Sequence, residues 1–145
     1  MIEYVLDTNV LSELMRARPN PTLESRVAGS RALCAIPAPV IDELQFGVNR
    51  IFSGERRAMF QEWLEALMAD YPVIPLDAYC AQWHGRERAR LAAIGKPTSL
   101  YDGLIASIAV VNELVLVTHN TADFGDFASI RLDDWHQKLP QTKIG

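Results

Sequence analysis

Short apolar runs alternate along the chain with longer segments whose apolar residues recur at helical spacing. The short runs predict β-strands at residues 2–6, 33–36, 73–74, 114–118 and 130–132. The longer segments predict helices, one running from Asp7 through Leu14 and the others spanning residues 38–51, 55–71, 78–93 and 99–112. Because the strands are apolar throughout and alternate with helices, the pattern predicts an α/β fold, a small central parallel sheet with helices on both faces.

The composition is that of one globular domain, with 145 residues, 49% of them hydrophobic and 22% charged. No repeat or linker divides the chain, so residues 1–145 are expected to form a single domain. A formal net charge of −4 excludes a strongly basic coat for nucleic acid. The start of the chain lacks a signal-peptide pattern, and Asn112 and Glu113 interrupt its longest apolar run. We therefore expect a soluble, cytoplasmic protein with no membrane contact, whose two cysteines are buried free thiols.

Acidic residues follow two of the predicted strands. Asp7 comes directly after the first strand, and Asp123 lies beyond the strand at 114–118, after a short polar turn. In open α/β sheets, ligands bind outside the carboxyl ends of the strands. The topology therefore predicts that both carboxylates lie on one rim of the sheet.

Two further acids border the apolar faces of predicted helices. Glu43 lies three residues after Val40, and Asp102 lies three residues before Ile105. Neither acid has a Lys or Arg three or four residues away, and an unpaired carboxylate is costly to bury. Clustering the four acids adds mutual repulsion, which a divalent cation would relieve. Oxygen ligands favour Mg²⁺, with Mn²⁺ as the alternative.

Each acid also has an ordinary local interpretation. Asp7 is suited to cap a helix, and Asp102 lies at capping-box spacing from Ser99. Asp123 suits a polar turn, and Glu43 suits a solvated helix edge. The joint pattern favours a metal site. Other chemistries lack their motifs, since the chain has no GxGxxG or nucleophile elbow and its three histidines have no zinc-ligand spacing.

Four segments around these acids resemble the PIN-domain ribonucleases. More narrowly, they resemble the VapC-type toxins of bacterial toxin–antitoxin modules, in their FitB-like branch. The segments are residues 5–14 (VLDTNVLSEL), 38–44 (APVIDEL), 101–106 (YDGLIA) and 117–124 (VTHNTADF). They occur in the family's order and span nearly the whole chain.

The resemblance implies an Mg²⁺- or Mn²⁺-dependent endoribonuclease with a PIN-like domain. It also implies a homodimer that forms a hetero-oligomer with a small, cognate, DNA-binding antitoxin. Asp7 and Asp102 match the family's usual metal ligands, and Glu43 and Asp123 match its other two acids. Further matches are the polar positions that orient these carboxylates, namely Thr8, Asn9, Thr118 and Asn120. His119 is a departure, because related sequences often carry arginine there.

An RNA substrate requires cationic partners despite the acidic average. The densest basic stretch contains Arg86, Arg88, Arg90 and Lys96, which we expect to bind RNA unless they only solvate a helix face. The alternative function is a catalytically weak PIN-fold binding module that acts with its antitoxin in operator binding and regulation.

Overall fold

A five-stranded parallel sheet forms the centre of the computed structural model, which describes residues 1–138. In chain order the strands are β1 (Tyr4–Leu6), β2 (Cys34–Pro37), β3 (Val73–Ile74), β4 (Val115–Val117) and β5 (Leu132–Asp133). They lie in the order β3-β2-β1-β4-β5, and Val5 pairs with Ala35 on one side and Leu116 on the other. The strand order reverses beside β1, which is the place where open α/β sheets bind ligands.

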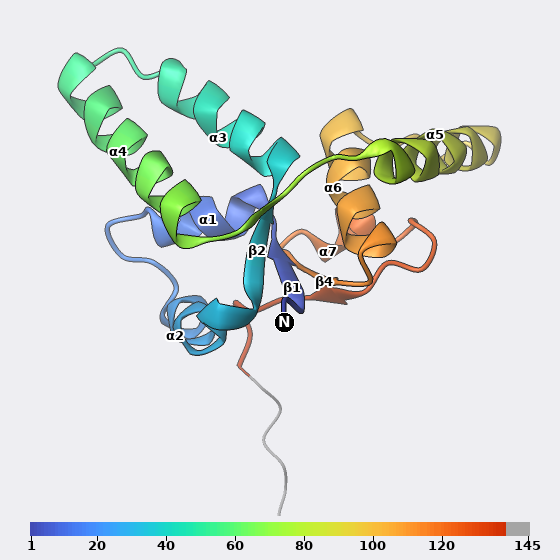
Figure 1. Cartoon of the computed structure of the whole chain (residues 1–145), viewed down its shortest axis with the longest axis horizontal. Helices are drawn as coiled ribbons and strands as arrows, with labels where there is room; N and C mark the ends of the chain where they lie inside the picture. The colour runs from blue at the N-terminus through green and yellow to red at the C-terminus, as the bar shows by residue number, and fades with distance from the viewer. Residues whose placement is uncertain (139–145) are drawn as a thin grey trace, which may run out of the picture.

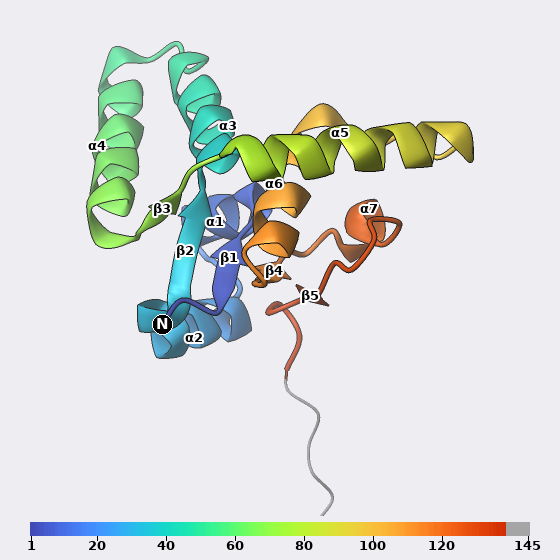
Figure 2. The same ribbon diagram turned by 45° about the vertical axis from the view of Figure 1, so that its right-hand side comes forward.

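The helices cover both faces of this sheet, as predicted. They are α1 (Thr8–Leu14), α2 (Pro21–Ser30), α3 (Ala38–Asn49), α4 (Gly54–Asp70), α5 (Ala78–Ala93), α6 (Leu100–Val111) and α7 (Thr121–Phe124). Crossovers between parallel strands are right-handed. The connections that run from β1 through β2 to β3 therefore lie on one face of the sheet, and those that run from β3 through β4 to β5 lie on the other. Accordingly, α1 lies behind the sheet and α6 in front of it in Figure 2. The helical hairpin of α3 and α4 extends beyond the sheet (Figure 1).

The second helix was absent from the sequence prediction, which used the prolines at 19 and 21 only as a helix end. Asn20 caps α2, since its side-chain oxygen accepts from Leu23 N at 3.0 Å. Pro21 occupies the first helical position, where no amide hydrogen is needed. The segment at 19–21 therefore starts α2, whereas α1 already ends at Leu14.

The end of the chain also differs from the prediction. The last strand, expected at 130–132, is Leu132–Asp133, and it pairs with Leu116 and Val117 of β4. The turn before Asp123 is a short helix, α7, which begins after Asn120. Both differences arise where elements are too short to show a period in the sequence.

The core is built around the central strands. Val5, Leu6, Ile36, Leu116 and Val117 are fully buried, as expected for strands covered on both faces. Both cysteines are buried and free, as predicted. Within residues 1–138, no helix combines the length and apolar character that crossing a bilayer requires. The rigid strands hold the residues at their carboxyl ends in place.

Candidate active site at the carboxyl ends of β1 and β4

Asp7 is the most buried acid of the predicted set. It follows β1, caps α1, and is 5% exposed. Its Oδ1 accepts from the Thr8 amide at 2.8 Å. Its Oδ2 accepts from the Asn9 side-chain amide at 2.8 Å and from the Thr118 hydroxyl at 2.9 Å. Asp7 therefore caps α1 with one carboxylate oxygen while Asn9 and Thr118 hold the other.

Thr118 and Asn9 connect the ends of the two adjacent strands. The hydroxyl of the fully buried Thr118 accepts from Asn9 Nδ2 at 3.1 Å and from the Asn120 amide at 3.1 Å. Asn9 Oδ1 accepts from the His119 amide at 3.0 Å. Asn9 and Thr118 thus orient the Asp7 carboxylate through their side chains, and Thr8 orients Glu43 as described below. Asn120 contributes only its backbone amide to this network.

Glu43 reaches the same rim from α3. Thr8 Oγ1 donates to Glu43 Oε1 at 2.9 Å, so the residue after Asp7 fixes the second acid. Glu43 is partly buried beside the buried Leu44, in agreement with its predicted position on the edge of the apolar face. One of its carboxylate oxygens is held by a hydrogen bond, and the other has no hydrogen-bond partner within residues 1–138.

Asp102 lies in the first turn of α6. Ser99 caps this helix by accepting from the Asp102 amide at 3.1 Å, so the backbone of Asp102 makes the predicted cap while its side chain remains available. Asp123 lies on α7, whose contacts with α6 bring the fourth acid to the site. Its side chain is exposed.

Burial and mutual repulsion raise the pKa values of Asp7, Glu43 and Asp102. Burial raises the pKa of Asp7, and Asp102 adds to the rise while the hydrogen bonds from Thr118, Thr8 and Asn9 oppose it. Burial also raises the pKa of Glu43, with Asp7 and Asp102 contributing repulsion. Burial raises the pKa of Asp102, and the charge of Asp123 adds to it. The four acids therefore share one electrostatic environment.

The donor set fits a hard divalent cation. Within residues 1–138, none of the four acids forms an ion pair with Lys, Arg or His. No three of them bring ligand oxygens within 4.8 Å of one another in this part of the chain. Mg²⁺ commonly keeps several waters and binds directly to only one or two carboxylates. The spacing of the acids suits such a water-rich site.

A groove of about 450 Å³ opens next to Glu43 and Thr8. Helices α1, α3 and α4 form its walls, with apolar side chains that include Leu44, Val48, Phe60 and Trp63. Arg16 and Arg56 add positive charge to the lining. The helical hairpin therefore provides an amphipathic surface that leads directly to the acids.

The predicted basic stretch on α5 divides into two pairs. Arg90 forms an ion pair with the buried Glu87 and donates to the Asp126 carbonyl at 2.8 Å. Lys96 lies 3.5 Å from Asp126 Oδ1. Arg86 and Arg88 are exposed and form no ion pair within residues 1–138. Arg86 and Arg88 therefore have no ion-pair partner in this part of the chain, whereas Arg90 and Lys96 each have one.

The chain matches the PIN domain over residues 4–130. It belongs to the PIN-domain family. The VapC ribonuclease Y4jK of Sinorhizobium fredii is 32% identical over 127 residues, which cover 83% of this chain and 89% of the relative. Toxin FitB of Neisseria gonorrhoeae is 29% identical, with 91% of this chain and 98% of that protein covered. The family assignment made from the four motifs is confirmed.

The fold of this PIN-domain protein agrees with a solved relative. The crystal structure of VapBC2 from Rickettsia felis, bound to a DNA fragment from its promoter, contains a chain that superimposes with a TM-score of 0.82. The two chains are 27% identical, and the match covers 93% of this chain and 99% of the other. The protein is therefore a VapC-type PIN domain, with the α/β architecture that its sequence predicted.

Proposed function

We propose that this protein is a metal-dependent endoribonuclease and acts as the toxin of a toxin–antitoxin pair. The observation that carries the proposal is the group of partly buried acids, Asp7, Glu43 and Asp102, whose charges no Lys, Arg or His neutralises within residues 1–138. Burying such charges without a partner is unfavourable unless a cation joins them. Relatives named as ribonuclease and toxin support the same activity.

Mg²⁺ or Mn²⁺ is the cofactor that the donor set favours. Asp7 and Asp102 would hold the principal ion, and Glu43 and Asp123 would complete the site through direct or water-mediated contacts. When bound, the ion lowers the pKa of a water and neutralises charge on the scissile phosphate. Three donors fix the Asp7 carboxylate, so its position requires little reorganisation when a substrate arrives.

Glu43 is suited to position the attacking water and take its proton. Thr8 holds Oε1, which leaves Oε2 to accept a hydrogen bond from water. Glu43 is only partly buried, so a water molecule can reach this free oxygen. Proton transfer from water to Glu43 would accompany attack on the phosphorus and departure of one RNA oxygen.

RNA phosphates require cations near this acidic site, and Arg86 and Arg88 are proposed to supply some of them. Both are exposed on α5, which packs against the helix that carries Asp102. Arg90 and Lys96 would contribute less, since both have acidic partners. Because cellular RNA is the proposed substrate, we place the activity in the cytoplasm.

The proposed partner is a small, cognate, DNA-binding antitoxin. A relative of this chain has been solved in a VapBC2 assembly on promoter DNA, which supports the proposal. The groove beside Glu43 combines apolar walls with Arg16 and Arg56, so it suits an amphipathic segment of such a partner. Binding there would obstruct the site. We also propose that the toxin forms a homodimer and, with the antitoxin, a larger hetero-oligomer.

The deciding experiment incubates antitoxin-free protein with structured and unstructured RNAs in Mg²⁺, Mn²⁺ or EDTA. We expect discrete cuts that EDTA abolishes and that Asp102→Asn reduces at least about 1,000-fold. Glu62→Gln is the control, since Glu62 is an exposed acid of α4 that forms no ion pair within residues 1–138. Metal-independent cutting, or full activity in Asp102→Asn, would contradict the proposal. A folded protein that binds its antitoxin but cuts no RNA would support the catalytically weak binding module instead.

A further inference from the structure

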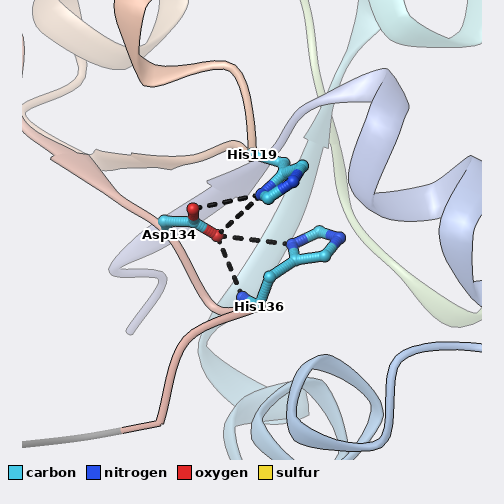
Figure 3. Close-up of side chains that lie close together, drawn as sticks. All are labelled: His119, Asp134 and His136. Carbon is cyan, nitrogen blue, oxygen red and sulfur yellow. Dashed lines mark hydrogen bonds and ion pairs between the residues drawn. The ribbon is translucent and has the colours of Figure 1, made fainter.

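A second cluster of ligand-type side chains lies beside the carboxylate site. His119 follows β4, and Asp134 and His136 follow β5. Because β4 and β5 are neighbouring parallel strands, their carboxyl ends place these three residues together. Figure 3 shows Asp134 beside the two imidazole rings, with dashed lines that join its carboxylate to both histidines. The sequence alone does not predict metal binding by these histidines, since 17 positions separate them and no zinc motif joins them.

Two distances in this cluster are close to the spacing between the ligands of a tetrahedral metal ion. His119 Nδ1 lies 3.1 Å from Asp134 Oδ2, and His136 Nδ1 lies 3.3 Å from Asp134 Oδ1. One ligand atom from each of the three residues lies within 4.8 Å of the others. Zn²⁺ binds nitrogen and oxygen at roughly 2.0–2.1 Å, so its ligands lie about 3.3 Å apart in a tetrahedron.

His136 contains a buried nitrogen with no hydrogen-bond partner. Its Nδ1 makes no hydrogen bond within residues 1–138, and its side chain is only 12% exposed. Asp134 is held toward it, because the His136 amide donates to Asp134 Oδ1 at 3.0 Å. This nitrogen lies 3.3 Å from Asp134 Oδ1 but forms no hydrogen bond with it, and a metal bond would satisfy the buried atom.

The two imidazole rings stack, with centroids 4.0 Å apart and planes inclined by 24°. A metal ion lies close to the plane of each ring that binds it, so nearly parallel rings cannot share an ion without turning. The His119 side chain is 55% exposed and is the ring with room to turn. Metal binding would therefore replace the stacked pair by two rings that converge on one ion.

We propose that His119, Asp134 and His136 bind one Zn²⁺ ion at a site separate from the four acids. Two imidazoles and one carboxylate suit Zn²⁺, whereas an all-oxygen set suits Mg²⁺. The ion would join the segment after β5 to the loop after β4. That loop also contacts the catalytic region, because the His119 amide donates to Asn9, which in turn donates to Asp7. Zinc would thus stabilise the network that orients Asp7.

The test is a Zn²⁺ titration of the full chain against a chromophoric chelator, with excess Mg²⁺ present to occupy the four acids. We expect one Zn²⁺ per chain, and at least a 100-fold loss of affinity in His119→Ala and in His136→Ala. Asp102→Asn is the control and should keep its Zn²⁺ affinity. Because the readout is binding, it remains informative even if RNA cleavage is never observed.

Histidine NMR locates the ion independently. The chain has three histidines, so each ring gives an assignable set of signals. Zn²⁺ should shift the ring resonances of His119 and His136 and leave those of the buried His84 unchanged. The proposal is overturned if folded wild-type protein binds no Zn²⁺ at micromolar concentration. It is also overturned if both alanine variants keep their affinity while Asp102→Asn loses it.

Discussion

The imidazole of His84 in α5 lies directly against Gly103 in α6, the residue after Asp102. A Cβ atom added to Gly103 would lie 2.3 Å from His84 Nε2 and 2.5 Å from its Cδ2. Both residues are buried. Glycine at this position therefore allows the close approach of two helices, one of which carries a proposed metal ligand.

Gly103→Ala should destabilise the protein by roughly 1–3 kcal/mol, because the extra methyl forces the ring or the helix to move. RNA cleavage should fall as Asp102 moves with α6. Thermal unfolding and cleavage rates check both effects. His84→Ala in the same chain opens space for the methyl, so the double variant should be more stable than the sum of the single changes predicts by about 1 kcal/mol. If the stability changes of the two single variants simply add in the double variant, the contact between His84 and residue 103 is not the cause of the destabilisation.

The hydrogen bond that the Thr118 hydroxyl donates to Asp7 is the basis of a second prediction. Thr118→Val keeps the shape of the side chain but removes a donor to the buried Asp7 Oδ2. We expect an Mg²⁺ affinity about 10–100-fold weaker and a comparable loss of cleavage at limiting metal. Metal titrations of activity provide the measurement. Thr118→Ser retains the hydroxyl and should behave much more like the wild type; equal losses in both variants would assign the effect to packing.

Asp102 contributes to the pH dependence of stability in the metal-free protein. Burial, with repulsion from Asp123, raises its pKa above the ordinary 3.8. The folded state therefore binds this proton more tightly than the unfolded state, so the stability that it contributes is lost as pH rises through the raised value. Above that range the ionised group opposes folding.

Removing this charge should stabilise the metal-free protein. At neutral pH, Asp102→Asn should raise the melting temperature by about 1–3 °C without metal. This difference in melting temperature between Asp102→Asn and the wild type should disappear at pH values below the ordinary pKa of aspartate. Adding Mg²⁺ should then stabilise the wild type more than the variant, because the ion binds to the folded wild-type site. Melting curves across pH, with EDTA or Mg²⁺, test this. A lower melting temperature for the variant in EDTA would contradict it.

The two kinds of cation on and after α5 should differ in RNA binding. Arg86→Gln with Arg88→Gln should reduce the salt slope of single-stranded RNA binding by about 0.7 for each phosphate contact that is lost. The matched double variant, Arg90→Gln with Lys96→Gln, should change the slope less, since these cations already have acidic partners. Both slopes are measured from RNA binding at several salt concentrations, with each double variant made in the inactive Asp102→Asn protein. Equal slopes in the two double variants would argue against this assignment.

Local sequence patterns were sufficient for most of the fold. The strand at 73–74 and the helix at 78–93 have the predicted bounds, because apolar periodicity and flanking breakers are properties of neighbouring residues. The missed helix, Pro21–Ser30, shows the limit of this approach. Its capping Asn20 and first-turn proline also suit a helix end, and only the packing of buried Leu23 and Val27 distinguishes the two.

The sequence by itself determined the family, the sheet architecture and the chemical character of the four acids. The order of residues shows which acids follow a strand and which lie on the apolar face of a helix. A short apolar run marks each strand, and apolar residues at helical spacing mark each helix face. The tertiary structure decided which side chains hold those acids, such as Thr8 on Glu43, and which groups meet across the molecule. The pairing of β4 with β5 unites His119, Asp134 and His136, and the approach of α5 to α6 requires Gly103. Such contacts join residues distant in the chain, and no local spacing encodes the distance between them.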